Sequence, residues 1–154
     1  MKIEPLIGLG VWLALQSRAS ATTHDEAMAV IDPPGGYSAA IVRFAQAIAF
    51  AEGFGIPGTV PTRLHNPGDL KASSVPSVGA DAQGHLRFAS DADGWLALYR
   101  QLALIVAGRS RVYTLEMTIA QMGTRYAGDS ANWTANVARA LAVPPTTTLR
   151  EMLT

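Results

Sequence analysis

The stretch Ser38–Gly53, SAAIVRFAQAIAFAEG, decides how this chain is read. It has no proline and no glycine before its last residue, so it predicts a helix that stops at that glycine. At about 100° per residue, Ile41, Ala45 and Ile48 fall on one apolar stripe, and Glu52 falls in the middle of the same stripe. Burial and the negative end of a helix dipole both disfavour a charged carboxylate. Glu52 is therefore predicted to be an acid that keeps its proton near neutral pH.

The composition indicates one folded domain. The chain has 154 residues, of which 49% are hydrophobic and 16% are charged, which argues against disorder. Its 12 basic and 12 acidic residues include no basic run, so nucleic acid is not an expected partner. The absence of cysteine excludes thiol catalysis and disulfides. His24, His65 and His85 have no metal-ligand spacing, so neither a metal site nor a cofactor is predicted.

The N-terminal segment, residues 1–21, has the layout of a secretory signal peptide. Lys2 precedes an apolar run from Leu6 to Leu15, and a small-x-small site ends at Ala21. The run is short for a permanent membrane span. We therefore expect export to the periplasm or cell envelope, with no stable span after removal of the signal. The alternative is an amphipathic N-terminal helix packed on the domain. Residues 22–36 form a connector, and residues 37–154 form the domain.

The rest of the chain predicts an α+β, mainly α-helical domain. Residues 53–71 read as a long structured loop, and residues 72–90 as a small hairpin with a turn at Gln83 and Gly84. The segment 91–108 is apolar nearly all round, which predicts the buried central helix. Shorter helices are expected at 118–126, where Thr118 and Gln121 have the spacing of a capping box, and at 130–142. A last helix is expected from Thr147 or Thr148, with Glu151 in the reciprocal capping position. The β and loop lobe is expected near Glu52.

The sequence Asn66-Pro67-Gly68-Asp69 predicts a tight turn within that loop. Proline fixes one φ angle and glycine tolerates a positive one. Such a turn presents the Asn66 side chain and backbone amides in a fixed direction. An ordinary structural turn is the alternative reading of this motif.

Several segments together resemble the small lysozyme-like proteins of phages and bacteria, within the lysozyme and lytic transglycosylase superfamily. The resemblance rests on AIAFAEGF at 47–54, NPGDL at 66–70, Phe88 followed by DGW at 93–95, and a similar tail from residue 118 onward. It covers residues 37–153. It implies a lysozyme-like domain that cleaves the β-1,4 bond between N-acetylmuramic acid and N-acetylglucosamine in peptidoglycan. Phage-particle or prophage origin is the alternative to export.

The resemblance also implies roles for particular residues. Glu52 matches the catalytic acid, and Asn66, Asp69 and Tyr126 match positions near the glycan cleft. His65, beside Asn66, is a further candidate for the cleft. Glycan strands are the expected partner, and the protein is expected to be a monomer.

The number of carboxylates separates two forms of this chemistry. A glycoside hydrolase normally uses two, and the candidates for the second are Asp69, Asp81, Asp91 and Asp93. A lytic transglycosylase needs one glutamic acid, which protonates the leaving oxygen and then accepts the proton of the sugar's own 6-hydroxyl. The sequence therefore favours a lytic transglycosylase. A non-catalytic glycan-binding or structural protein of a virion or envelope is the alternative from another class.

Overall fold

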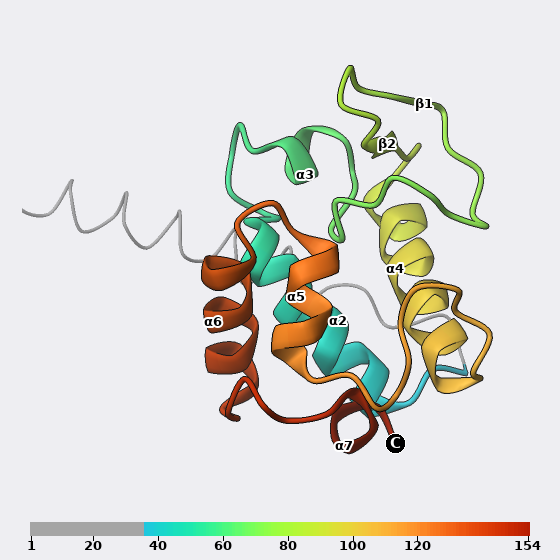
Figure 1. Ribbon diagram of the computed structural model, residues 1–154. Helices are drawn as coiled ribbons and strands as arrows, with labels where there is room; N and C mark the ends of the chain where they lie inside the picture. Colours follow the sequence, from blue (N-terminus) through green and yellow to red (C-terminus); the bar gives the residue numbers. More distant parts are fainter. Residues whose placement is uncertain (1–35) are drawn as a thin grey trace, which may run out of the picture.

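The computed structural model describes residues 36–154, which form a mainly helical domain with one two-stranded antiparallel sheet (Figure 1). This confirms the predicted α+β, mainly α class. The elements in chain order are α2 (Ala39–Glu52), α3 (Val60–Arg63), β1 (Gly79–Ala80), β2 (Leu86–Arg87), α4 (Asp91–Val106), α5 (Ile119–Tyr126), α6 (Ser130–Leu141) and α7 (Leu149–Leu153). The predicted signal peptide, residues 1–21, and nearly all of the connector 22–36 lie outside the described residues.

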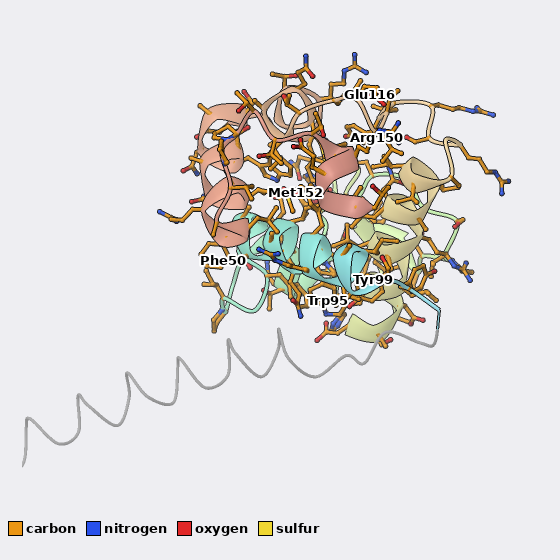
Figure 2. All side chains as sticks on the ribbon, turned by 90° about the horizontal axis from the view of Figure 1, so that it is seen from below. Phe50, Trp95, Tyr99, Glu116, Arg150 and Met152 are labelled. Atoms are coloured by element: carbon orange, nitrogen blue, oxygen red, sulfur yellow. The ribbon has the colours of Figure 1, made fainter. Side chains whose placement is uncertain are left out.

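Helix α2 has the bounds and the buried face that its sequence predicts. Ser38 caps its start, because its Oγ accepts a hydrogen bond from the Ile41 amide at 3.3 Å, and Gly53 ends it with a φ of 75°. Ile41 and Ile48 are buried, whereas Phe50 on the other side is exposed (Figure 2). The helix packs against α4, α6 and α7. Its last residue, Glu52, therefore lies at the edge of the core.

Helix α4 shares the interior with α2. Trp95, Leu98 and Tyr99 are buried, and Trp95 stacks on Tyr99 with 5.8 Å between ring centroids. Figure 2 shows both aromatic residues beside α2. Arg100 stays exposed, so α4 is buried on a broad face rather than all round. The central position predicted for the segment 91–108 is shared by α4 and α2, because α2 lies between α4 and α6 (Figure 1).

The two C-terminal capping boxes are confirmed, and they meet in space. Thr118 and Gln121 cap α5, and Thr148 and Glu151 cap α7. The two cap residues, Thr118 and Thr148, also form an isolated antiparallel bridge. Helix α6 packs on both α5 and α2. The start of α5 is therefore fixed to the start of α7.

The predicted loop and hairpin form a lobe beside the end of α2. The hairpin pairs Gly79 with Arg87, and its turn contains Gly84 with a φ of 85°. Backbone hydrogen bonds from Leu86 to Leu70 O at 2.8 Å and from Phe88 to Leu64 O at 3.0 Å attach this hairpin to the 53–71 loop. The short helix α3 within that loop was not predicted.

None of the helices in residues 36–154 combines the length and the apolar character that a bilayer span requires.

Candidate functional site

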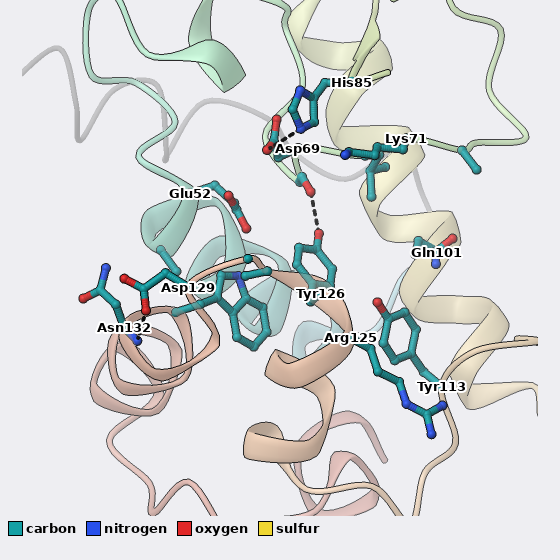
Figure 3. Close-up of a pocket in the computed structure, with 17 residues that line it drawn as sticks. Glu52, Asp69, Lys71, His85, Gln101, Tyr113, Arg125, Tyr126, Asp129 and Asn132 are labelled. Carbon is teal, nitrogen blue, oxygen red and sulfur yellow. Dashed lines mark hydrogen bonds and ion pairs between the residues drawn. The ribbon is translucent and has the colours of Figure 1, made fainter. Parts of the chain in front are cut away.

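A cleft of about 450 Å³ lies where the lobe meets the helices, a volume typical of small-ligand sites (Figure 3). Its walls come from the end of α2, the loop after the NPG turn, the hairpin, α4 and the α5–α6 region. The polar side chains among its lining residues are Glu52, Asp69, Lys71, His85, Gln101, Tyr113, Arg125, Tyr126, Asp129, Asn132 and Trp133.

Glu52 enters this cleft from the last turn of α2. Burial, together with the nearby charge of Asp69, raises the pKa of Glu52 from 4.5 to about 7. The indole N–H of Trp133 and the imidazole of His85 act in the opposite direction and lower this pKa. The balance leaves a carboxylic acid that can both donate and accept a proton near neutral pH, as general acid–base catalysis requires.

Asp69 is the second carboxylate of the cleft. It follows the NPG turn with a φ of 47°, and the Asp69 amide donates to Asn66 O at 3.0 Å, which closes the turn. Burial raises the pKa of Asp69, and the charge of His85 opposes this rise. The structure thus brings Glu52 and Asp69, predicted separately, into one site.

The turn differs in one respect from its prediction. The positive φ falls on Asp69, and Gly68 is not among the residues with positive φ. Glycine is needed at position 68 for space instead. A Cβ there would lie 2.9 Å from Leu98 Cδ1 and 3.1 Å from the hydroxyl of Tyr126.

Tyr126 holds the turn from the helical side. Its hydroxyl donates a hydrogen bond to Gly68 O at 2.6 Å (Figure 3), and its ring stacks on Trp133 with centroids 4.9 Å apart. Burial, with Glu52 and Asp69 nearby, raises the pKa of Tyr126 well above its usual value, so the phenol stays neutral and keeps its donor. The Tyr126–Trp133 stack is therefore a rigid wall of the cleft.

Asn66 does not reach the cleft, contrary to the prediction that it contacts glycan. Its side chain is fully buried. Nδ2 donates to Leu70 O and to Leu86 O, and Oδ1 accepts from the Leu70 amide, each at 2.9 Å. Since the amide is used in full, Asn66 fastens the NPG turn to β2. Its effect on the site is exerted through the loop that carries Asp69.

His65 also lies away from the cleft. Its Nδ1 lies 2.7 Å from Asp91 Oδ1 at the start of α4, and its side chain is about half exposed. The adjacent contact is tight, because a Cβ on Gly94 would lie 1.9 Å from His65 O. His65 therefore belongs to the contact between the loop and α4, and it is not placed to bind a ligand in this cleft.

Three side chains that can carry positive charge line the cleft, and none of them was assigned to the site from the sequence. His85 reaches the cleft from the hairpin turn, and Lys71 and Arg125 add positive charge to it. A signal for His85 was present, because the alternation from His85 to Phe88 places it at the beginning of a strand next to a turn. Lys71 and Arg125 carried no such signal in the sequence.

Two buried polar atoms of the cleft have no partner in residues 36–154. They are Asp69 Oδ1 and Trp133 Nε1; the third such atom of the described chain is Trp95 Nε1 in the core. Buried polar groups are normally hydrogen-bonded. Trp133 Nε1 is close enough to Glu52 to lower its pKa although it forms no regular hydrogen bond, whereas Asp69 Oδ1 has no donor that offsets its burial.

Comparisons with known proteins do not extend this description of the cleft. No protein-family model, curated protein or solved structure matches the chain. Within residues 36–154, no group of three or more His, Cys, Asp or Glu side chains is arranged to hold a metal ion. The chemistry must be argued from the cleft itself.

Proposed function

We propose that this protein is a peptidoglycan-cleaving muramidase of the lytic transglycosylase type, with Glu52 as its acid and base. The observation that carries the proposal is a glutamic acid with a pKa of about 7 inside a polar cleft of about 450 Å³. Glycosidic bond cleavage requires such an acid, because the leaving oxygen must be protonated as the bond breaks. The resemblance of the sequence to lysozyme-like proteins points to the same substrate.

The reaction needs only one residue to move protons. Glu52 donates its proton to the glycosidic oxygen as the C1–O bond breaks, while the N-acetyl group of the sugar stabilises the positive charge at C1. The resulting carboxylate then accepts the proton of the sugar's 6-hydroxyl, whose oxygen bonds to C1. The products are a free 4-hydroxyl and a 1,6-anhydro end, and Glu52 is protonated again. General acid–base help of this kind contributes roughly 10²–10⁴ in rate.

The other cleft residues have supporting roles in this proposal. Asp69 supplies negative charge near the developing positive charge, and the indole N–H of Trp133 faces Glu52 and favours the carboxylate that forms after proton transfer. The Tyr126–Trp133 stack keeps both groups in place. Asn66 acts only by fixing the turn.

A hydrolase is the second candidate, and the position of Asp69 in the same cleft as Glu52 favours it. In that reaction Asp69 acts as nucleophile or base, and water replaces the 6-hydroxyl. Mass spectrometry of the released muropeptides separates the two, because anhydro ends are lighter than hydrolytic ends by one water.

The test is release of soluble muropeptides from purified cell walls by the Glu52→Gln variant. We expect the variant to fold and to release none. Glu116→Gln is the matched control, since Glu116 is exposed and pairs with Arg150 on another face of the molecule (Figure 2). Undiminished release by Glu52→Gln excludes the mechanism. Retention of the wild-type protein on insoluble peptidoglycan without turnover supports a glycan-binding protein instead.

A further inference from the structure

His85 and two carboxylates form an array at the edge of the cleft that the proposed reaction does not require. His85 lies between two carboxylates, with Nδ1 at 2.8 Å from Asp81 Oδ2 and Nε2 at 3.4 Å from Asp69 Oδ2 (Figure 3 shows the contact with Asp69). Asp81 is on the turn of the hairpin, and Asp69 is on the wall of the cleft. The array therefore connects the turn of the hairpin to the neighbourhood of Glu52.

Asp81 fixes both the position and the tautomer of the imidazole. Its Oδ1 accepts from the backbone amides of Gln83 at 2.9 Å and His85 at 2.8 Å, so the carboxylate closes the turn that carries His85. These bonds and His85 lower the pKa of Asp81, which keeps it ionised and able only to accept. The Nδ1 proton therefore faces Asp81, and Nε2, which faces Asp69, attracts that carboxylate when the imidazole carries a proton on both nitrogens.

Asp69 needs such a partner to stay charged and in place. Its backbone has a φ of 47°, its Oδ1 is buried without a partner in the described chain, and burial disfavours its ionised form. His85 is the strongest influence that opposes this effect, ahead of Lys71. Without His85, Asp69 loses the largest influence that favours its charged form.

We propose that His85, oriented by Asp81, is a positioning residue that holds the carboxylate of Asp69 on the cleft wall next to Glu52 through their ion pair. This inference rests on the proposed function for its meaning in catalysis, and its first test does not depend on activity. The charged and titratable groups that share the cleft with this array are Glu52 from α2, Lys71 from the loop, Arg125 and Tyr126 from α5, Asp129 before α6, and Tyr113.

The proposal therefore gives Glu52 and Asp69 different roles. The negative charge of Asp69 raises the pKa of Glu52. An Asp69 that loses its charge therefore makes Glu52 a stronger acid and removes the charge that faces the reacting sugar. Loss of His85 is expected to reduce the rate most at acidic pH, where Asp69 is protonated first.

The direct test is a carboxyl NMR titration of Asp69 in wild type and in His85→Gln. We expect the midpoint of Asp69 to rise by about 1 pH unit, as is usual on removal of an opposite charge at this distance. His65→Gln is the matched control, because His65 also pairs with an aspartate but lies outside the cleft. An unchanged Asp69 midpoint in folded His85→Gln overturns the inference, whether or not the protein cleaves cell walls.

The kinetic test uses the pH profile of wall digestion. In His85→Gln the acidic limb of kcat is expected to move upward by a similar amount, with KM little changed. A purely structural role for His85 predicts a uniform loss at every pH, and that result counts against a positioning role.

Asp81→Asn provides a second variant that retains an acceptor for the turn amides. Its imidazole ¹⁵N shifts should show loss of the preference for the Nδ1–H tautomer. If His85→Gln does not fold, this measurement decides, because an unaltered tautomer in Asp81→Asn refutes the orienting role of Asp81.

Discussion

Replacement of Glu52 by glutamine is expected to stabilise the protein at neutral and alkaline pH. Glutamine imitates the protonated acid, which is the form that the folded protein favours. The pKa of Glu52 rises from 4.5 to about 7 on folding, so the folded state binds the proton more tightly than the unfolded state. By linkage, the unfolding free energy of the wild type falls as pH increases between these two values.

The size of the effect follows from the same two pKa values. Each pH unit between 4.5 and about 7 is worth about 1.4 kcal/mol. The charged form of Glu52 therefore costs the folded state about 3 kcal/mol above pH 7, and almost nothing below pH 4.5. For a domain of this size, about 3 kcal/mol corresponds to roughly 10 °C in Tm.

The assay is urea unfolding of wild type and Glu52→Gln at intervals from pH 4 to pH 8.5. The difference in unfolding free energy should increase in favour of the variant across the window from 4.5 to about 7, and then become constant. Taking the difference removes contributions from groups common to both proteins, such as the histidines. A difference that stays constant from pH 4 to pH 8.5 refutes the reasoning, because it means that Glu52 is as well solvated when folded as when unfolded.

Glu151→Gln is a control with the opposite sign. Hydrogen bonds from Thr148 lower the pKa of Glu151, so its stabilising effect is present at neutral pH and is lost as pH falls through its folded pKa. This variant is expected to be less stable than wild type at neutral pH, with a difference that shrinks under acid conditions. The same chemical change thus has opposite pH dependence at two positions.

Three other changes test the parts that support the cleft. Gly94→Ala should destabilise the domain by about 2 kcal/mol or more in thermal or urea unfolding, because its Cβ would meet loop backbone at 1.9 Å; Gly128→Ala, which has open space, should not. Asn66→Ala should cost roughly 3 kcal/mol in urea unfolding, because it leaves several buried backbone groups without partners, and a loss below 1 kcal/mol would contradict its role as a fastener. Trp133→Phe removes the N–H that lowers the pKa of Glu52, so carboxyl NMR should find that pKa above 7, and a lower value would show that the indole does not act on the acid.

The helices were predictable because their signals are local. The Ser38 cap, the Gly53 stop and the two capping boxes each depend on residues within one or two turns, and all are observed. The stripe of α2 also predicted that Glu52 would be desolvated, and its side chain is partly buried in the structure. The short helix α3 was missed because four residues after Thr59 carry no periodicity.

The site was only partly predictable, because its parts come from distant segments. Asp69 and Tyr126 were identified by motif, whereas His85 and its pairing with Asp81 depend on how the hairpin lies against the loop. Asn66 was given a ligand role because the resemblance to lysozyme-like proteins implies a position near the glycan cleft. Its burial results from the docking of β2, which a pattern of single residues does not encode.

The bridge between Thr118 and Thr148 has a consequence for how the molecule responds to damage at a distance. Because α5 and α7 begin on the same short ladder, neither can fray from its N-terminus without loosening the other. The Tyr126–Trp133 stack, which includes the last residue of α5, thus depends on the bridge at the start of that helix. Substitutions at Thr118 or Thr148 would therefore weaken the wall of the cleft, although neither residue lines the cleft.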